Sequence, residues 1–420
     1  MSVIVLLTLG ALVILNYSTC RDFRYPPVLM CGVWLIVMAL YYLSPLEINP
    51  IGIVTVLIFI STTVAFSAGG YLTLALHESD PSMGGARLSL VDWPSASARV
   101  KLILLTLSGA AFPLIIRRAS QLASQSGYDN FFVALRTEFL ATDTGGYGYL
   151  NYGFFLSFFA TFLYAIEPRS RLGQRLQFYL SLTLSLGYAT LGTGRSTFLF
   201  IIATLSGIAV MQGRFNIKKL VVSALVFLFV FVFFGIAAGK GGYSDAPLSD
   251  NISSVGESLL VYVVGPIPAF DQVTRADLPL GYGKNMLIGP LNSIRGFAGR
   301  ARVTRLRGDV YVPFATNVYT GINAPYQDFG IVGVTFVFAM IGAICTYFYL
   351  RGLAGDSLYI FCYAVSLYPL LLVAFSDEYF DPLNDWIKYG LCAYLYFRIG
   401  KGRQSQTTLA QSRLTDCRLL

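Results

Sequence analysis

The chain has 420 residues, of which 55% are hydrophobic and only 12% are charged, and its mean hydropathy is +0.63. Soluble domains carry about 25% charged residues, so this composition excludes an ordinary soluble enzyme. A backbone in lipid must satisfy its polar groups within its own segment, and we therefore expect an all-α polytopic membrane protein. The net charge of +8 is interpreted through topology, because most basic residues of membrane proteins mark cytoplasmic loops.

Apolar windows of about 20 residues predict about eleven transmembrane helices, within a range of about 10–12. We expect them at 2–17, 27–44, 51–76, 100–117, 149–166, 176–192, 196–212, 218–238, 329–350, 356–375 and 383–399. The first run has no basic n-region and no Ala-x-Ala site, so it is interpreted as a membrane helix rather than a signal peptide. Residues 1–420 are predicted to form a single membrane domain, with one large external loop at 239–328 and a tail at 400–420.

Lys and Arg predict the orientation. They occur in the segments after the first, third, fifth, seventh, ninth and last predicted helices, whereas 45–50 and 376–382 contain none. The positive-inside rule then places the N-terminus outside and the C-terminus in the cytoplasm. Residues 118–148, 191–197 and 239–328 face outward, and the six cysteines avoid these regions. No disulfide is expected.

The large external loop is rich in arginine. IRGFAGRARVTRLRG, residues 294–308, packs five arginines into fifteen residues. Arginine presents a rigid fork of donors that suits phosphate or carboxylate. Two interpretations remain open: a site for an anionic ligand such as a pyrophosphate, or an interfacial segment whose arginines contact lipid headgroups. The candidate ligand-binding arginines are Arg275, Arg295, Arg300, Arg302 and Arg305.

Arg195 lies in a short outward turn, GTGRST, between two predicted helices. The glycines are expected to let the turn close tightly and present backbone N–H groups. The start of a helix also favours anions. We favour a functional role for Arg195, with snorkelling at the interface as the alternative.

Residues 253–275 are mostly apolar but are interrupted by Gly265, Pro266 and Pro268. We predict a short amphipathic or interfacial helix here. Asp271 and Arg275 are spaced as an ordinary i,i+4 ion pair, whereas Glu257 has no such neighbour. Further along, GYGKNMLIG contains glycines without the strand and helix that would make them a phosphate loop.

The outer end of the last predicted helix pair, SDEYFDPLND, carries Asp377, Glu378, Asp381 and Asp385. Oxygen ligands of this kind bind divalent cations, but acidic residues are also common helix caps. We predict no metal site. The single histidine, His77, falls on the predicted cytoplasmic side, which disfavours histidine-dependent chemistry at the outer face.

Three segments carry a family resemblance: GRST at 194–197, YVVGPIPAFDQ at 262–272 and NVYTGINAPYQDFGIVG at 317–333. In their order and architecture the chain resembles Wzy-type O-antigen polymerases, which polymerise oligosaccharide repeat units. The resemblance implies a multi-pass protein of the bacterial inner membrane with the helical fold of C-type glycosyltransferases. It implies a periplasmic site without metal or cofactor, which transfers the growing glycan from undecaprenyl pyrophosphate to an incoming lipid-linked repeat unit.

The implied partners are the lipid-linked oligosaccharide, membrane lipids and a separate chain-length regulator, with no nucleic acid. Glycosyl transfer needs cationic stabilisation of the leaving pyrophosphate, for which Arg195 and the loop arginines are candidates. It also needs a base, for which Asp328 and Glu257 are candidates, with Asp271 less favoured. Asp328 is alternatively the N-cap of the following helix. The predicted sugar-facing edge comprises Asn317, Tyr319, Thr320, Tyr326 and Asp328, and Tyr147 and Tyr149 are further stacking candidates.

Two other functions remain as alternatives. An O-antigen ligase would transfer finished glycan to lipid A core, but an external histidine is expected for it and none is present. A flippase or transporter of lipid-linked oligosaccharides would show internal repeats and charges within its helices. Here charged residues lie at the ends of the predicted helices.

Overall fold

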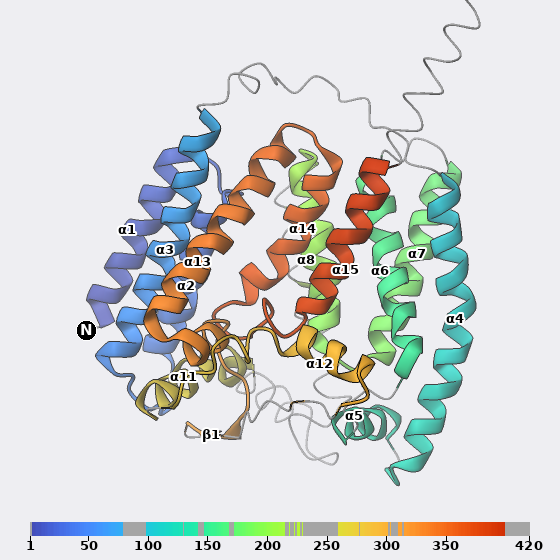
Figure 1. The fold of residues 1–420 in the computed structure, drawn as a ribbon, viewed down its shortest axis with the longest axis horizontal. Coiled ribbons are helices and arrows are strands. Elements are labelled where there is room, and N and C mark those ends of the chain that lie inside the picture. Colours follow the sequence, from blue (N-terminus) through green and yellow to red (C-terminus); the bar gives the residue numbers. More distant parts are fainter. Residues whose placement is uncertain are drawn as a thin grey trace, which may run out of the picture. The chain divides into compact units, whose positions relative to one another are not determined.

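The computed structural model describes residues 2–78, 98–128, 130–141, 147–167, 172–214, 259–276, 278–300 and 315–399, with a few single residues and residues 310–312 between them. The helices are α1 (Ser2–Cys20), α2 (Pro26–Leu43), α3 (Ile53–Glu78), α4 (Ala98–Gln125), α5 (Phe131–Ala141), α6 (Asn151–Ile166), α7 (Leu172–Leu191), α8 (Arg195–Met211), α11 (Pro266–Arg275), α12 (Ile288–Phe297), α13 (Asn323–Leu353), α14 (Ser357–Leu372) and α15 (Leu383–Tyr394) (Figure 1). A 3-10 turn (Gly148–Leu150) precedes α6, and a π-helical turn (Leu395–Ile399) follows α15. Strands β1 (Val310–Tyr311) and β2 (Ala315–Thr316) form a small antiparallel pair.

Among the described residues, six helices are long and apolar enough to cross a membrane: α1, α2, α3, α4, the Gly148–Ile166 helix and α13. Helices α8 and α14 are apolar but shorter. The protein is therefore an all-α, multi-pass membrane protein. The number of eleven spans stays a prediction, because α7 and α15 are less apolar and most of 218–238 lies outside the described residues.

The chain divides into two compact units. The first contains α1, α2, α3, α11, α12, α13, the strand pair and the end of α14. The second contains α4 to α8, the start of α14 and most of α15.

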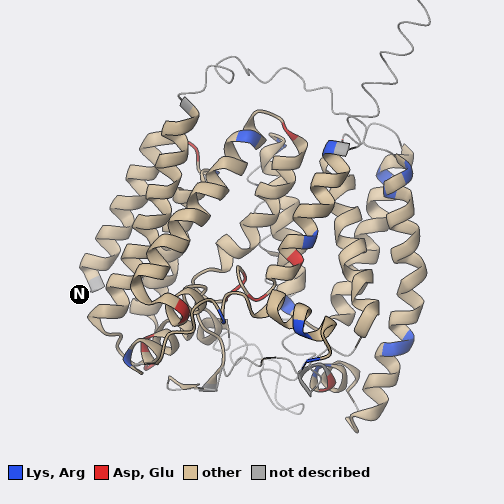
Figure 2. Cartoon of the chain, in the orientation of Figure 1, with Lys and Arg blue, Asp and Glu red and all other residues tan. Residues whose placement is uncertain are grey.

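In the first unit, loops that the positive-inside rule assigns to one side lie together. Tyr349, near the end of α13, donates a hydrogen bond to Asp22, in the α1–α2 loop, at 2.6 Å. At the other end, Asp271 of α11 accepts a hydrogen bond from Gly52, just before α3. Charged residues cluster at the helix ends (Figure 2). This arrangement agrees with the predicted alternation of the loops.

The second unit shows the same consistency. Lys101 at the start of α4 forms an ion pair with Glu167 at the end of α6. Tyr147, just before α6, donates to the carbonyl of Leu191 at the end of α7, at 2.9 Å. Arg398 pairs with Asp356 at 2.7 Å. Segments predicted to share a side therefore contact one another within this unit too.

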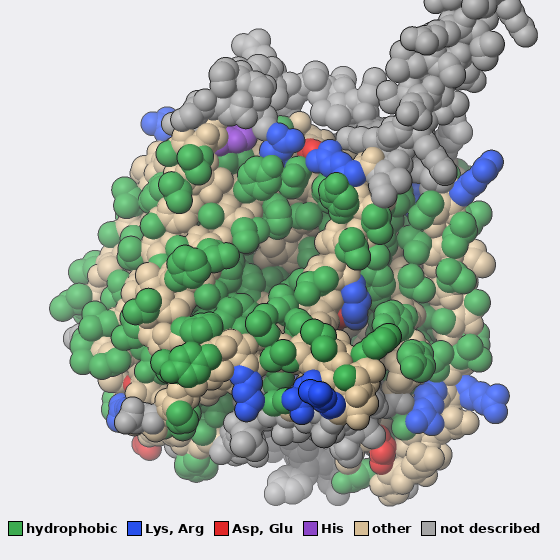
Figure 3. Space-filling model, in the orientation of Figure 1, with side chains coloured by type: hydrophobic (Ala, Val, Ile, Leu, Met, Phe, Trp, Pro, Cys, Tyr) green, Lys and Arg blue, Asp and Glu red, His purple; other side chains and the backbone are tan. Residues whose placement is uncertain are grey.

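Helices α3 and α13 pack with their backbones in contact. A methyl group at Gly69 would overlap the carbonyl oxygen of Ala339, and one at Gly342 would overlap that of Phe66. Thr73 also donates to the carbonyl of Ala343 at 3.2 Å. Small residues allow this close approach in membrane helices. Figure 3 shows hydrophobic side chains over much of the surface at these helices.

Helix α13 comprises two helical segments that meet at Gly330, which has φ 64° and ψ −156°. Only glycine adopts this conformation readily. The apolar segment after Gly330 begins close to the predicted start at residue 329. The short helical segment before it, from Asn323, escaped the hydropathy window because it is short and contains Asn323, Gln327 and Asp328.

Candidate functional site

The helix predicted near 253–275 is present as α11, within a helical stretch from residue 259 to 275. Its apolar face is buried by an aromatic column. The ring centroids of Phe270 and Phe59 of α3 lie 5.6 Å apart, and those of Phe59 and Trp34 of α2 lie 4.5 Å apart. Tyr326 of α13 lies edge-on to Phe270 at 5.3 Å. The column fixes α11 across one end of the first unit.

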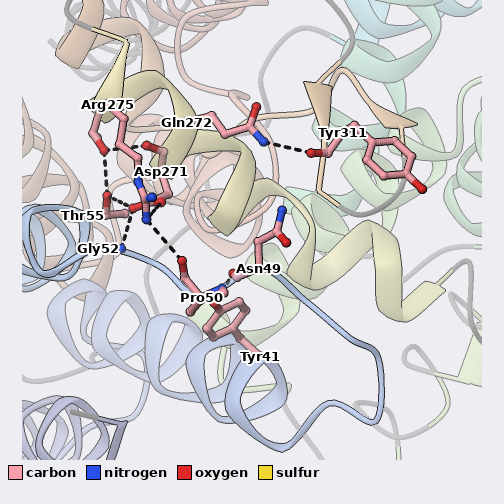
Figure 4. Close-up of polar contacts among 10 residues, drawn as sticks. Tyr41, Asn49, Pro50, Gly52, Thr55, Asp271, Gln272, Arg275 and Tyr311 are labelled. Atoms are coloured by element: carbon pink, nitrogen blue, oxygen red, sulfur yellow. Dashed lines mark hydrogen bonds and ion pairs between the residues drawn. The ribbon is translucent and has the colours of Figure 1, made fainter.

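Asp271 is buried on α11, with 4% of its surface exposed. Its Oδ1 accepts hydrogen bonds from the Gly52 N–H at 2.7 Å and from the Thr55 hydroxyl at 2.6 Å (Figure 4). These donors lie at the start of α3, so Asp271 caps that helix from a distant segment. The predicted i,i+4 pair is also confirmed, since Arg275 Nη2 lies 2.6 Å from Asp271 Oδ2.

Arg275 remains 62% exposed despite this ion pair. Its Nη2 also donates to the Pro50 carbonyl at 3.3 Å (Figure 4). An exposed ion pair contributes little stability, so the pair mainly orients the guanidinium. Arg275 is thus held at the surface of the first unit with a fixed direction.

Arg295 and Arg300 lie at the end of α12. Gly299 has φ 64°, the Arg300 N–H donates to the Arg295 carbonyl at 2.8 Å, and the Gly299 N–H donates to the Gly296 carbonyl at 3.2 Å. This is a Schellman motif, which reverses the chain at a helix C-terminus. It places both arginines on one turn, where the helix dipole also favours cations.

Asn292 clamps the chain that follows this turn. Its Nδ2 donates to the Val303 carbonyl at 2.8 Å, and its Oδ1 accepts from the Val303 N–H at 2.8 Å. The clamp holds the turn that carries Arg295 and Arg300 against α12. We call residues 292–300, together with Val303, the clamped arginine turn. Arg302 and Arg305 lie outside the described residues.

Asp328 is fully buried. Its Oδ1 accepts from the Asn285 N–H at 3.0 Å and from Asn285 Nδ2 at 2.9 Å, and its Oδ2 accepts from the Met286 N–H at 2.8 Å. The Gly281 N–H donates to the Gln327 carbonyl at 2.8 Å. Asp328 therefore ties the α13 segment to the chain that leads into α12.

The prediction that Asp328 caps the helix that follows it is wrong, because both carboxylate oxygens accept hydrogen bonds from Asn285 and Met286 of a different segment. As a base, Asp328 stays a prediction, although burial and three donors favour a structural role. A methyl group at Gly281 would overlap Asp328 Oδ1. The glycines of 281–289 thus serve close packing and turns: Tyr282 and Gly283 have φ of 50° and 90°.

The predicted sugar-facing edge is divided by burial. Asn317 is exposed and Tyr326 is half-buried, whereas Tyr319 and Thr320 are buried. Within the described part of the chain, Thr320 Oγ1 and Asn323 Oδ1 have no hydrogen-bond partner. Direct sugar contact therefore stays a prediction for Asn317 and Tyr326, and would require opening of the segment at Tyr319 and Thr320.

Arg195 belongs to the second unit and is the first residue of α8, as predicted. It is half-buried. The turn before it differs from the expectation, because the positive φ of 51° falls on Thr193 and not on a glycine. A β-branched residue rarely adopts this conformation, which stores strain beside the arginine.

Tyr147 braces the same turn through its hydrogen bond to Leu191. Burial raises the pKa of Tyr147 well above its usual range, so its hydroxyl remains protonated. Tyr147 is buried and unsuited to stacking, whereas Tyr149 is 92% exposed.

The remaining predicted carboxylates have individual roles. Glu257 lies outside the described residues. Asp377 accepts from the Phe380 N–H, Glu378 accepts from the Ser376 hydroxyl, and Asp385 pairs with Lys388. Among the described residues there is no group of three potential metal ligands.

Sequence reasoning missed Asn285, Asn292 and Thr193. The partners of the two asparagines are 43 and 11 residues away in the sequence, and no local pattern marks them. Comparison with protein-family models, curated proteins and solved structures finds no match.

Proposed function

We propose that this protein polymerises lipid-linked oligosaccharide repeat units. It would transfer the growing glycan from undecaprenyl pyrophosphate to the sugar of an incoming lipid-linked unit. The observation that carries the proposal is the clamped arginine turn, which is tied through Asp328 to the NVYTGINAPYQDFG segment at the ends of apolar helices. A basic surface at the ends of apolar helices suits a ligand with an anionic head and a lipid tail.

Pyrophosphate departure develops negative charge, and positioned cations stabilise it. In the first unit, the Arg275 guanidinium is held by Asp271 and the Pro50 carbonyl, and the backbone that carries Arg295 and Arg300 is held by the turn at the end of α12. A positioned donor such as Arg275 needs little rearrangement as charge develops. We propose that these arginines bind the pyrophosphate of a lipid-linked substrate. Arg195, in the second unit, stays a candidate from the sequence alone.

The acceptor hydroxyl needs a base. Asp271 is an unfavourable candidate because its two oxygens are engaged by Gly52, Thr55 and Arg275. Asp328 is similarly engaged. Asp328 and Glu257 stay the candidates for the base, and Glu257 lies outside the described residues.

The test uses purified protein, a lipid-linked repeat unit and a gel that resolves glycan length. A ladder supports polymerisation. A single transfer to lipid A core would instead indicate the ligase alternative, and translocation across vesicles without new glycosidic bonds would indicate a flippase. We also propose that the site faces the periplasm. The proposed partners are the lipid-linked oligosaccharide, membrane lipids and a separate chain-length regulator.

Arg195 provides the sharpest variant. We expect Arg195→Ala to abolish the ladder while expression and apparent melting temperature stay near those of the unmodified protein. Arg117→Ala, at an exposed position of α4, is the matched control and should leave the ladder intact. Unchanged ladders with Arg195→Ala would remove this residue from the site.

A further inference from the structure

The second unit contains a partly open pocket of about 410 Å³. Its lining comes from the end of α6, the start of α7 and the end of α8, and comprises Ala165, Arg175, Phe178, Tyr179, Leu205, Ile208, Ala209, Gln212 and Arg214. The turn that carries Arg195 lies at the opposite ends of α7 and α8. The pocket is therefore separate from the site proposed above.

Helical spacing builds the walls. Arg175, Phe178 and Tyr179 follow i, i+3, i+4 and share one face of α7. Leu205, Ile208, Ala209 and Gln212 likewise share one face of α8. The accessible apolar part of the lining comes from Leu205 and Ala209, which are half-buried, whereas Ala165, Phe178 and Ile208 are buried behind it.

The rim is polar and cationic. Arg175, Tyr179 and Arg214 are exposed. Gly213 has φ 66°, the Gly213 N–H donates to the Val210 carbonyl at 3.1 Å, and the Arg214 N–H donates to the Ala209 carbonyl at 3.0 Å. This Schellman motif turns the chain at the end of α8 and sets Arg214 at the pocket.

A further contact holds the pocket in shape. Gln212 Nε2 donates to the Ile166 carbonyl, which joins the end of α8 to the end of α6. Helices α6, α7 and α8 and the turns at their ends thus form the walls of the pocket. The volume is in the range of small-ligand sites, about 300–1,000 Å³.

We propose that this pocket binds the phosphate group of an anionic phospholipid. Arg175 and Arg214 contact the phosphate, since guanidinium groups match phosphate geometry. The start of one acyl chain lies over the apolar floor formed by Leu205 and Ala209. Free inorganic phosphate shares the headgroup chemistry but would leave this floor uncovered.

The site is at the end of the unit that holds Lys101 and Glu167, where hydropathy and charge predict the cytoplasmic surface. The cytoplasmic leaflet carries anionic lipids that attract basic segments. A formed pocket adds to this general attraction, because it selects for a phosphate with an attached apolar chain. The inference does not depend on the proposed polymerase activity.

The experiment compares binding of phosphatidylglycerol and phosphatidylcholine with identical acyl chains to the detergent-purified full chain, read by native mass spectrometry and by apparent melting temperature. Inorganic phosphate is a third probe. Two variants test the pocket: Arg175→Gln with Arg214→Gln removes the cations, and Ala209→Phe fills the apolar part at constant charge. Arg99→Gln, an exposed residue of α4 outside the pocket, is the control.

We expect phosphatidylglycerol to bind more tightly than phosphatidylcholine, the double variant to weaken it about tenfold or more, and Arg99→Gln to match the unmodified protein. Ala209→Phe should weaken phosphatidylglycerol binding as well. If inorganic phosphate competes with phosphatidylglycerol and raises the apparent melting temperature equally, the pocket is a phosphate site whose ligand is soluble phosphate rather than a lipid. Equal binding of the two lipids, or unchanged phosphatidylglycerol binding in both pocket variants, would overturn the proposal.

Discussion

Replacing Asp328 with asparagine tests whether this carboxylate holds the structure together or performs chemistry. The carboxylate accepts three hydrogen bonds from Asn285 and Met286 while fully buried. An asparagine has one acceptor oxygen, so at least one buried donor loses its partner and the new NH₂ group faces another N–H. An unsatisfied buried donor costs about 1–3 kcal/mol, and we expect about 2 kcal/mol for Asp328→Asn.

A compensating variant separates the two roles. In Asp328→Asn with Asn285→Asp, the amide and carboxylate exchange positions, so the side-chain hydrogen bond re-forms with donor and acceptor reversed. The double variant should be more stable than the sum of the single changes predicts by about 1 kcal/mol, which is a coupling typical of contacting residues. Thermal unfolding in detergent measures stability, and the glycan ladder measures activity.

Stability and activity should change together if Asp328 is structural. Asp328→Asn then lowers the apparent melting temperature and weakens the ladder, and the exchange variant recovers part of both. Gly281→Ala should reproduce the loss, since its methyl group would displace the carboxylate. An unchanged melting temperature with a lost ladder would refute the structural reasoning and identify Asp328 as the base.

Three further predictions follow from the contacts at the helix ends. Asn292→Ala removes both hydrogen bonds to Val303 and should weaken the ladder several-fold without changing charge; a ladder equal to that of the unmodified protein would mean that the clamp is unnecessary. Asp271→Asn should lower stability by about 1–2 kcal/mol through a weaker cap on α3 and a lost ion pair, measured by thermal unfolding; no shift would contradict the capping role. Burial raises the pKa of Asp22, but hydrogen bonds from Arg24 and Tyr349 outweigh this and hold it below its ordinary value of 3.8. The lowered pKa stabilises the fold at pH values above the pKa of Asp22 in the unfolded chain, and this stabilisation is lost as the pH falls through the pKa of Asp22 in the folded protein. The destabilisation caused by Tyr349→Phe should therefore shrink below about pH 4. A difference in stability between variant and unmodified protein that stays constant from pH 6 to pH 3 would exclude this linkage.

Local patterns predicted the helices well. Apolar runs identified the six membrane-length helices, and the spacing of Asp271 and Arg275 predicted their ion pair. The short turn before Arg195 was also predictable from its glycines. These features depend on residues close in sequence, where periodicity and turn chemistry are informative.

Long-range contacts were beyond such patterns. Asp271 meets Gly52 across 219 residues, and Asp328 meets Asn285 across 43. The sequence therefore indicated a cap or a base at Asp328 but not the buried link between two segments. Similarly, no local sequence pattern indicates that Thr193 rather than Gly194 takes the positive φ.

The glycine contacts between α3 and α13 fix the register between these two helices. Helix α3 bears the cap provided by Asp271, and α13 carries Asp328, so the register between the two helices sets the spacing between Arg275 and the NVYTGINAPYQDFG segment. A single added methyl group at Gly69 or Gly342 would push the backbones apart. Under the proposed function, Gly69 and Gly342 would affect the spacing of the substrate-binding groups without contacting the substrate themselves.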